Sequence, residues 1–484
     1  MSTPKRFGNI IGGEVVDATE TTLNINPSNT DDVVGEFAQA SLTDLNAAIA
    51  AARSAAPGWA ATTLGVRHDI LRRAADEVLR RKDELGALLS REEGKTLSEG
   101  IGEVTRAGQV LGFFAGECLR TGGELMPSVR AGVSVEVTRE PLGVVGVITP
   151  WNFPVAIPAW KIAPALAYGN AVVFKPAELV PASAWELVDI LQRAGLPTGT
   201  LNLVMGSGAV LGQALIEHTD VDAITFTGSV PVGRGIAAAC VTGPTMKKMQ
   251  LEMGGKNPLV ILDDADLDTA VECAVNGAYF STGQRCTASS RLIVTEGIHD
   301  RFVEMLCDRL EKLTVDDALK SGTDIGPAVS AEQLKKNLAY IDIGLDEGAT
   351  LRRGGKRLTR EHNGHYLEPA LFVDGNNNMR IAREEIFGPV AVVLRARDYD
   401  DALAIANDTE FGLSAGICTT SLKYATDFRN HIRSGVAMVN LATAGLDFHV
   451  PFGGTRASSY GPREQGRYAV EFYTTVKTSY IAAG

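Results

Sequence analysis

The sequence contains few cysteines, and none of them is spaced like a metal ligand. Its 484 residues include six, at Cys118, Cys240, Cys273, Cys286, Cys307 and Cys418. No C-x-x-C pair occurs, and no histidine stands at metal-ligand spacing from any of them. A structural zinc site is therefore not expected, and six cysteines in a chain of this length do not indicate a disulfide scaffold. We predict no metal site.

Long apolar runs and clusters of basic residues are also missing. No stretch of 18 apolar residues occurs, and the N-terminal residues lack the apolar segment of a signal peptide. Acidic residues outnumber basic ones by 58 to 46, which gives a formal net charge of −12. Nucleic-acid binding depends on neutralising phosphates with Lys and Arg. We therefore expect a cytoplasmic protein with neither a nucleic-acid nor a membrane partner.

Short apolar segments alternate with helical patterns through the middle of the chain. The first series of apolar segments covers 144–148, 171–174, 201–204 and 223–226, and helical patterns at 184–194 and 208–217 lie between them. Such segments are typical of buried parallel strands, and their alternation with helices predicts βαβ units and a doubly wound sheet. A second series follows Gly255, at 259–262, 291–294 and 391–394. Two series predict an α/β protein of two domains with a cleft between them.

The N-terminal region and one later segment have different patterns. From Ser41 to Leu119 the spacing of apolar residues predicts helices, and Ser41-Leu-Thr-Asp44 resembles a capping box at the first of them. Residues 67–93 keep a helical spacing throughout. Residues 133–137 alternate between apolar and polar, which predicts a half-exposed strand.

Two segments are candidates for binding a nucleotide. Phe226 to Gly233 predicts a strand, a Gly-Ser turn and a helix whose N-terminus can bind a phosphate, although an ordinary βα turn has the same pattern. Lys175 and Glu178 directly follow a predicted strand, where a carboxylate can bind a ribose diol; a surface Lys–Glu pair is the alternative. The segment 206–212 is one residue too long for the dinucleotide fingerprint.

Three residues are candidates for chemistry on a carbonyl group. Cys286 follows a glycine-containing turn and adjoins Arg285, a cation that would favour the thiolate. Burial would raise the pKa of Glu252 towards that of a general base. Asn152 lies between two prolines that restrict its loop, so its amide can face a developing oxyanion. The alternatives are an inert buried cysteine, a paired core carboxylate and a turn asparagine.

These motifs occur together in a single order along the chain. The order is TPWNFP at 149–154, KPAE at 175–178, FTGSVPVG at 226–233, LEMGGKNP at 251–258, GQRC at 283–286, EEIFGP at 384–389 and PFGG at 451–454. The chain resembles the aldehyde dehydrogenase superfamily over essentially its whole length. The resemblance implies an α/β fold with a Rossmann-like cofactor domain, an α/β catalytic domain and a β oligomerisation arm.

The resemblance also implies roles for individual residues. Cys286 matches the nucleophile, Glu252 the base for deacylation, Asn152 the oxyanion donor beside the Cys286 backbone N–H, and Lys161 a lysine near the nicotinamide. The cofactor-binding residues would be Trp151, Lys175, Glu178, Gly208, Gly228, Ser229, Glu385 and Phe387. The substrate-binding residues would be Phe153, Trp160, Arg106, Arg285 and Phe452.

The reaction implied is oxidation of an aldehyde to a carboxylate with NAD or NADP. Attack by the thiolate gives a thiohemiacetal, hydride transfer leaves a thioester, and water activated by Glu252 releases the acid. The presence of Glu252 favours hydrolysis over acyl transfer to coenzyme A or phosphate. Glu178 favours NAD, because a carboxylate binds the ribose 2′-hydroxyl and repels a 2′-phosphate.

The same resemblance predicts the domain limits and the assembly. The cofactor domain would comprise residues 1–125 and 143–254, and the catalytic domain residues 255–457. Residues 126–142 and 458–484 would form the arm, whose last segment alternates like a strand added to a neighbour's sheet. A homodimer or homotetramer is expected.

The C-terminal segment points to a substrate. Residues 449–481, and Pro462-Arg-Glu-Gln-Gly466 above all, resemble the α-ketoglutaric semialdehyde (2,5-dioxopentanoate) dehydrogenases. Trp160, however, stands where enzymes of the succinic semialdehyde type often have an arginine. Arg106 or Arg285 would then bind a substrate carboxylate, unless Arg285 only holds its loop or lowers the pKa of the thiol.

Other substrates and another class of function stay open at this point. Succinic semialdehyde or another aldehyde are the alternative substrates. A catalytically silent structural relative is the alternative class, and the intact set of Asn152, Glu252 and Cys286 argues against it.

Overall fold

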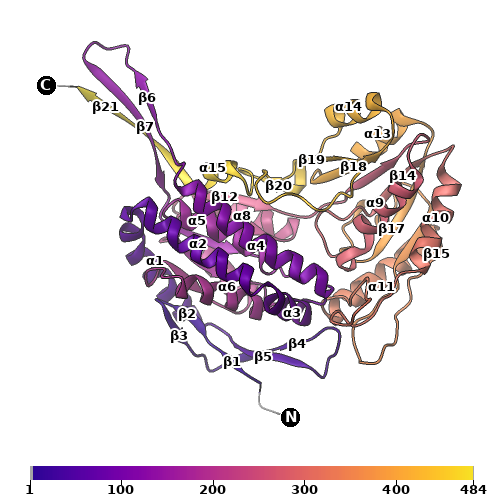
Figure 1. Ribbon diagram of the computed structural model, residues 1–484, viewed down its shortest axis with the longest axis horizontal. Coiled ribbons are helices and arrows are strands. Elements are labelled where there is room, and N and C mark those ends of the chain that lie inside the picture. The colour runs from indigo at the N-terminus through magenta and orange to yellow at the C-terminus, as the bar shows by residue number, and fades with distance from the viewer. Residues whose placement is uncertain (1–3, 483–484) are drawn as a thin grey trace.

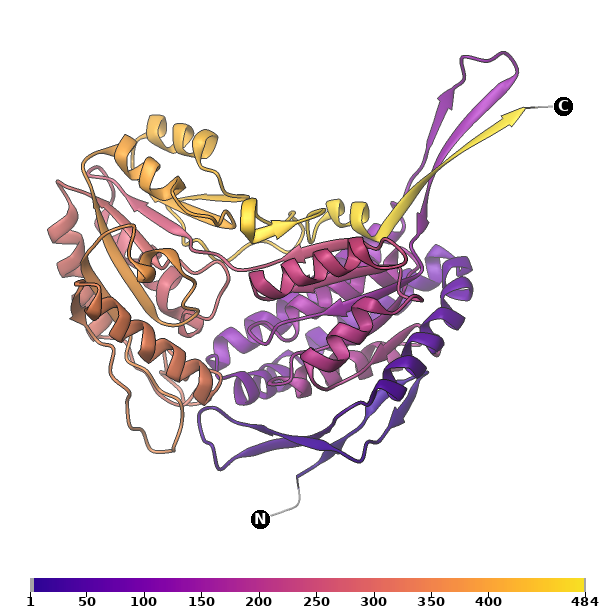
Figure 2. The same ribbon diagram turned by 180° about the vertical axis from the view of Figure 1, so that it is seen from behind.

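The protein, seen here as a computed structural model, is described over residues 4–482. Two α/β bodies lie side by side, and a β arm projects from the first of them (Figures 1 and 2). The first body contains an eight-stranded sheet of order β20-β12-β11-β8-β9-β10-β2-β3, in which the hairpin of β2 (Asn9–Ile11) and β3 (Glu14–Val16) forms one edge and β20 (Ser459–Tyr460) the other. Its five central strands are parallel and comprise β12 (Lys248–Glu252), β11 (Ala223–Thr227), β8 (Val144–Ile148), β9 (Ala171–Lys175) and β10 (Leu201–Leu203). The predicted doubly wound sheet is confirmed.

Helices cover both faces of this sheet. One face packs against α1 (Leu42–Ala61), η1 (Gly208–Gly212), α7 (Gln213–Glu217) and α8 (Val230–Thr242). The other packs against α2 (Leu64–Arg80), α4 (Leu97–Cys118), α5 (Ala156–Ala167) and α6 (Pro181–Arg193). Because its strands are buried on both faces, they are continuously apolar, the pattern that made them recognisable in the sequence.

The predicted N-terminal helices are present, with one difference. The Ser41–Asp44 capping box begins α1, as expected. The helical spacing of residues 67–93, however, belongs to two helices, because Arg81 is both the C-cap of α2 and the N-cap of α3 (Lys82–Glu93). The Arg81 guanidinium binds both Glu84 and Glu186, which fixes the break against α6.

The second body contains a seven-stranded sheet of order β15-β16-β17-β14-β13-β18-β19. Its strands comprise β15 (Thr350–Arg353), β16 (Ala370–Gly375), β17 (Val390–Ala396), β14 (Arg291–Thr295), β13 (Pro258–Ile261), β18 (Ser414–Cys418) and β19 (Val436–Val439). Its principal helices are α9 (Leu267–Tyr279), α10 (His299–Glu311), α11 (Ala331–Asp346), α13 (Tyr399–Asn407) and α14 (Leu422–His431). The three segments predicted as strands after Gly255 are all strands of this sheet.

Two smaller sheets complete the fold. The arm consists of β6 (Glu124–Pro127), β7 (Val133–Pro141) and β21 (Thr474–Ala482), in the order β21-β7-β6. Within the predicted arm segment 458–484, β20 (Ser459–Tyr460) instead pairs with β12 in the first body. A sheet of order β1-β5-β4 lies at the N-terminal end, where no sheet was predicted; its strands are β1 (Arg6–Phe7), β5 (Val33–Ala38) and β4 (Thr21–Ile25).

The carboxyl ends of the parallel strands carry most of the predicted site residues. The 149–154 loop follows β8, Lys175 ends β9, Gly228 follows β11 and Glu252 ends β12. Open α/β sheets bind ligands at this edge. From β12 the chain passes directly into β13 of the second body, so residues 253–257 join the two bodies beside the site.

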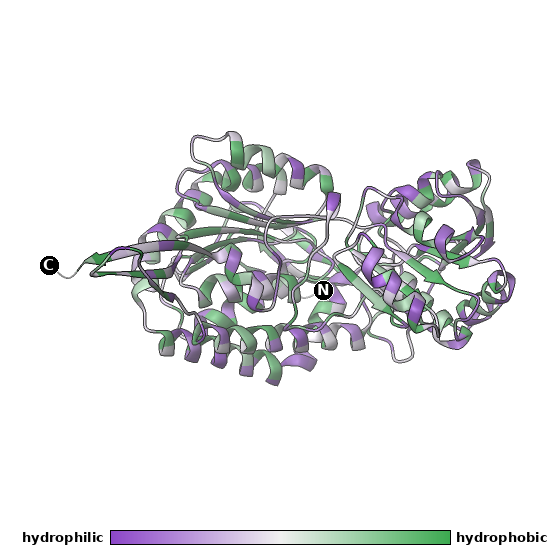
Figure 3. Ribbon diagram, turned by 90° about the horizontal axis from the view of Figure 1, so that it is seen from above, coloured by the Kyte–Doolittle hydropathy of each residue, from purple (hydrophilic) through white to green (hydrophobic). Residues whose placement is uncertain are grey.

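Apolar residues concentrate in the strands, while the surface helices carry both apolar and polar faces (Figure 3). No helix within residues 4–482 is long and apolar enough to cross a membrane.

Candidate active site

The predicted nucleophile follows a strained turn at the end of α9. Ser281 and Thr282 adopt positive φ angles of 50° and 57° in the short helix η2 (Phe280–Gly283). Non-glycine residues in this conformation cost about 1–2 kcal/mol each. Glu99 compensates by accepting hydrogen bonds from both the backbone N and the Oγ of Ser281, each at 2.8 Å. Strain held in this way at a loop is typical of a functional site.

Cys286 lies where two cavities meet. The first, of about 190 Å³, lies against residues of the predicted cofactor set, including Ser229, Glu385 and Phe387. The second, of about 310 Å³, contains all five predicted substrate residues. Among the described residues, Cys286 alone lines both. This position allows one sulfur atom to contact a substrate on one side and a cofactor on the other.

The charges around Cys286 differ from the expectation. Burial, together with the nearby carboxyls of Glu385 and Glu252, raises the pKa of the thiol to about 12. The guanidinium of Arg285 binds Glu99 at 3.0 Å and Asn276 Oδ1 at 3.2 Å. The prediction that Arg285 favours the thiolate is therefore not supported, and the thiol needs a proton acceptor before it can attack.

Asn152 is fixed from two directions. Its Nδ2 donates to the carbonyl oxygen of Gln284 at 3.0 Å, which ties the 149–154 loop to the cysteine turn. The backbone carbonyl oxygen of Asn152 accepts a hydrogen bond of 2.7 Å from Lys95 Nζ. A side-chain amide has two N–H donors, so one is left for a ligand.

The residues that support Asn152 from behind were not identified in the sequence analysis. Lys95 and Glu103 form a fully buried ion pair at 2.6 Å, with the ammonium 4.0 Å from the centre of the Phe153 ring. The other oxygen of Glu103 accepts bonds from the backbone N–H groups of Val155 and Ala156, at the start of α5. Glu103, a charged residue on the apolar face of α4, was the one available signal in the sequence. It does not identify the residue that pairs with it.

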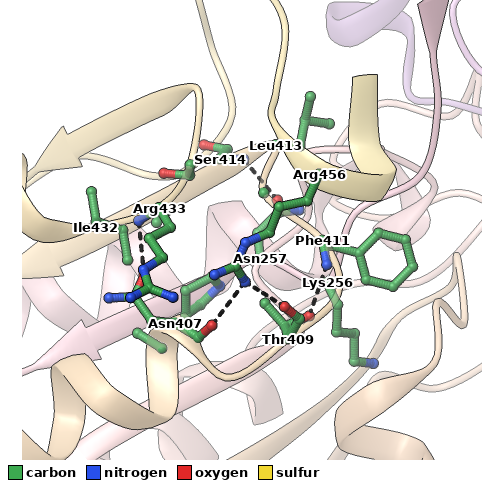
Figure 4. A pocket seen from close by; sticks show the side chains of 15 residues that line it. Lys256, Asn257, Asn407, Thr409, Phe411, Leu413, Ser414, Ile432, Arg433 and Arg456 are labelled. Carbon is green, nitrogen blue, oxygen red and sulfur yellow. Dashed lines mark hydrogen bonds between the residues drawn. The ribbon is translucent and has the colours of Figure 1, made fainter. Parts of the chain in front are cut away.

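Asn257 holds the Cys286 segment from the other side. Its Nδ2 donates to the carbonyl oxygens of Cys286 and Ala288, at 2.8 and 2.9 Å. Figure 4 shows the small pocket around Asn257 and Lys256, where the Arg456 guanidinium bonds the carbonyl oxygens of Asn407 and Thr409. The space there is about 10 Å³, close to the least that holds a water molecule, so it supports the loop and is no substrate site.

Glu252 ends β12 in a buried position. Burial raises the pKa of its carboxyl to about 8, and the nearby charge of Glu464 adds to this effect. Ser459 Oγ donates to Glu252 Oε2 at 2.6 Å. A carboxyl with such a pKa is mostly protonated at pH 7 and gains its base form as the pH rises towards 8, which suits a group that both takes up and gives back a proton.

Lys161 lies away from both cavities. Its ammonium is completely buried and binds Thr225 Oγ1 at 2.8 Å together with the carboxylate of Glu464. The structure thus places Lys161 in the core close to Glu252, and it lines neither cavity, whereas the resemblance implied a lysine near the nicotinamide.

The first cavity offers groups suited to a nicotinamide dinucleotide. Ser229 is the N-cap of α8, whose first N–H groups can bind a diphosphate. Trp151 and Phe387 meet edge to face with ring centroids 5.2 Å apart, and form an apolar wall. Glu385 accepts a bond from the backbone N–H of Gly255 at 2.8 Å and keeps an oxygen for a ribose hydroxyl. This donor set fits the cofactor.

Three further predicted residues lie together at the end of β9. Burial lowers the pKa of Lys175 to about 8, and its Nζ donates to the carbonyl oxygen of Pro176 at 2.8 Å. Glu178 Oε1 accepts a bond of 2.7 Å from the backbone N–H of Gly208. The carboxylate is thereby held at the surface with its second oxygen accessible, as binding an adenosine ribose requires.

The second cavity brings the predicted substrate residues together. Trp160 and Phe452 pack with ring centroids 5.8 Å apart, and Phe153, Arg106 and Arg285 lie around the same space. Gln465 also lines it, a residue of the 462–466 segment that the sequence marked as distinctive but to which it assigned no role.

The comparisons with known proteins settle the family. The family model described as aldehyde dehydrogenase family matches residues 15–479. The chain belongs to the aldehyde dehydrogenase family. It is an enzyme that oxidises aldehydes with a nicotinamide cofactor.

Individual aldehyde dehydrogenases are similar over nearly their full length. The alpha-ketoglutaric semialdehyde dehydrogenase of Bacillus subtilis (strain 168) is 44% identical over 458 residues, 94% of this chain and 93% of that one. The alpha-ketoglutarate semialdehyde dehydrogenase of Haloferax volcanii is 43% identical over 487 residues, 99% of each chain.

Solved structures of similar fold support the same family. Betaine aldehyde dehydrogenase of Staphylococcus aureus in complex with NAD+ has a TM-score of 0.95 at 34% identity, covering 98% of this chain and 95% of its own. An NADP-dependent enzyme of E. coli has a TM-score of 0.95 at 36% identity, covering 99% and 98%. The predicted aldehyde dehydrogenase fold is confirmed.

The raised thiol pKa gives a prediction for the cofactor-free enzyme. Since only the thiolate is alkylated, the rate of Cys286 modification by iodoacetamide should rise about tenfold per pH unit between about pH 7 and pH 10. Mass spectrometry of the cysteine peptide measures the rate, and the Cys286→Ala variant gives the background from other cysteines. A plateau below about pH 9 would contradict this picture of the site.

Proposed function

We propose that this aldehyde dehydrogenase oxidises α-ketoglutaric semialdehyde to α-ketoglutarate through a thioester on Cys286. The observation that carries the covalent route is the place of Cys286 at the junction of the two cavities. Its neighbours Asn152 and Glu252 supply the remaining groups that acyl chemistry needs, a fixed amide donor and a buried carboxyl.

The first half of the reaction forms a carbon–sulfur bond. Cys286 Sγ passes its proton to a water molecule and attacks the aldehyde carbon as a thiolate. The carbonyl oxygen becomes an oxyanion bound by Asn152 Nδ2 and the Cys286 backbone N–H. Donors fixed before reaction lower the barrier by about 2.7–4 kcal/mol each. The bound nicotinamide supplies the hydride acceptor that turns the thiohemiacetal into a thioester.

The second half releases the acid. Glu252 takes a proton from a water molecule whose oxygen adds to the thioester carbon, and the carbon–sulfur bond breaks to regenerate Cys286. Ser459 Oγ binds Oε2 of Glu252, so Oε1 is the oxygen left for the water. A pKa of about 8 means that the base form gains population as pH rises towards 8.

The proposed substrate is supported by the relatives and by the cavity. The Bacillus and Haloferax relatives are named for α-ketoglutaric semialdehyde. The second cavity combines aromatic walls with polar side chains, the composition typical of a site for a small polar molecule. Succinic semialdehyde is the second candidate, because it has the same charge and one carbon fewer.

A panel of aldehydes tests this proposal. Among α-ketoglutaric semialdehyde, succinic semialdehyde and hexanal, the first should have the highest kcat/KM in assays of NADH formation. Cys286→Ala should abolish turnover of all three but retain cofactor binding, because only the covalent step is removed. If hexanal is oxidised as efficiently as the acid, the substrate is wrong; if Cys286→Ala retains more than a few per cent of turnover, the nucleophile is wrong.

We also propose that NAD is the preferred cofactor. The support is Glu178, whose carboxylate is positioned by Gly208 and would repel a 2′-phosphate. Lys175, with its pKa lowered by burial, offsets that repulsion only in part.

Kinetics with both cofactors test the role of Glu178. The wild-type enzyme should show the higher kcat/KM with NAD, and Glu178→Gln should improve the NADP:NAD ratio by about tenfold, because it keeps the shape and removes the charge. Lys175→Met serves as the matched control and should shift the ratio the other way. A wild-type preference for NADP would show that the carboxylate does not face the ribose.

We propose that the arm assembles the protein into a homodimer or homotetramer. Its support is the large apolar side chains that the arm exposes, Leu125, Val129, Val476 and Tyr480. A monomer gains nothing from such a surface. The division into cofactor, catalytic and arm segments at the predicted residues belongs to the same proposal.

Light scattering measures the assembly. A chain ending at Tyr473 should have a lower molar mass in solution than the full chain, because β21 is lost. Lys477→Ala, which removes only the exposed ion pair with Glu140, should keep the full mass. A full chain of 51.3 kDa in solution would contradict the proposal.

A further inference from the structure

The substrate cavity contains side-chain N–H groups that bind nothing. Arg106 Nε, Trp160 Nε1 and Gln465 Nε2 are buried atoms with no hydrogen-bond partner among the described residues. Trp160 is 8% exposed and Gln465 is fully buried, and all three residues line the cavity that contains Cys286. A buried donor without a partner is destabilising, because it loses its bond to water and gains none, so three in one cavity indicate a ligand with acceptor atoms.

Arg106 supplies a positive charge that no carboxylate contacts directly, although Asp447 and Glu103 lie near it. Over residues 4–482 it forms no ion pair, and its guanidinium bonds the carbonyl oxygen of Leu446 and Gln465 Oε1, the latter at 3.0 Å. Arg285, the other predicted anchor, is already paired with Glu99. Of the two arginines in the cavity, Arg106 is therefore the one whose charge is left for a ligand.

The backbone directs Gln465 towards Arg106. Gln465 has a φ of 57°, a left-handed conformation that is unfavourable for a non-glycine residue. Its neighbour Glu464 is held by a reciprocal pair of backbone bonds with Phe452, both at 2.8 Å, and by Lys161. Because Oε1 of Gln465 is occupied by Arg106, its Nε2 is the atom available to a ligand.

Trp160 completes the group of donors formed with Arg106 and Gln465. Trp160 lies on α5 with its ring 5.9 Å from the Arg106 guanidinium. Its indole nitrogen can only donate a hydrogen bond. The three side chains thus present donors alone, together with one positive charge, and this combination selects an anion with several oxygen acceptors.

We propose that Arg106, Gln465 and Trp160 bind the 2-oxo acid end of the substrate while its aldehyde end reaches Cys286. This inference rests on the proposed function and deepens it. The carboxylate accepts hydrogen bonds from the guanidinium, and the adjacent oxo group accepts from the Gln465 amide or the indole. Succinic semialdehyde has a carboxylate but no oxo group, so it leaves a buried donor unpaired and is discriminated against.

Kinetics with a charged and an uncharged aldehyde test the proposal. Arg106→Met keeps the size of the side chain but removes the charge, and should lower the ratio of kcat/KM for α-ketoglutaric semialdehyde to that for hexanal by about 10- to 100-fold. The effect should lie in KM. Arg106→Lys should recover part of the ratio, since it restores charge without the second donor.

Substitutions at Gln465 and Trp160 test the roles of these two residues separately. Gln465→Glu places a carboxylate against that of the substrate and should lower the same ratio at least as much as Arg106→Met. Trp160→Phe keeps an aromatic wall and removes the N–H, so it should reduce the preference for α-ketoglutaric over succinic semialdehyde. An unchanged preference in this variant, together with an unchanged ratio in Gln465→Glu, would overturn the assignment of these two residues.

Product inhibition provides a readout that does not depend on the acid substrate. α-Ketoglutarate should inhibit hexanal oxidation competitively with the aldehyde, and Arg106→Met should weaken that inhibition by about 10-fold or more. Equal losses on both aldehydes with unchanged inhibition would show that Arg106 only supports residues 446–447. If the wild-type enzyme does not prefer the acid, the proposed substrate fails, while absent inhibition by α-ketoglutarate overturns the anion site itself.

Discussion

The hydrogen bond from Asn152 to the Gln284 carbonyl oxygen is the contact on which the active site depends. It joins a loop of the first body to the cysteine turn of the second, so one bond sets the position of both the oxyanion donor and the nucleophile. Glu99 adds a second connection, because it binds Ser281 and Arg285 from the first body. Any relative motion of the two bodies would therefore alter the geometry at Cys286 directly.

Two buried charges keep this junction rigid. Lys95 and Glu103 together bind the carbonyl oxygen of Asn152 and the first N–H groups of α5. Removing one partner of such a pair leaves an uncompensated charge, at a cost of about 3–5 kcal/mol. The same helix α5 carries Trp160, so the ion pair also fixes one wall of the substrate cavity.

The features that could be predicted from the sequence are those that depend on local hydrophobic pattern and on short motifs. The parallel strands of both sheets were recognisable because they are buried on both faces, and the site motifs follow those strands. It could not predict that Arg285 faces Glu99, that Gln465 bonds Arg106, or that Lys95 supports Asn152. Each of these contacts joins residues far apart in the chain, and a single sequence contains no record of which charge meets which. The raised pKa of Cys286 escaped prediction for the same reason.

The proposed mechanism depends on a thioester on Cys286 that Glu252 helps to hydrolyse. The most direct test is intact-mass analysis of Glu252→Gln after mixing with NAD+ and α-ketoglutaric semialdehyde. We predict a stoichiometric burst of NADH, a steady rate lower by about 100-fold or more, and the mass of the acyl group on the Cys286 peptide. Wild-type turnover without an adduct, or an adduct on another residue, would contradict the account.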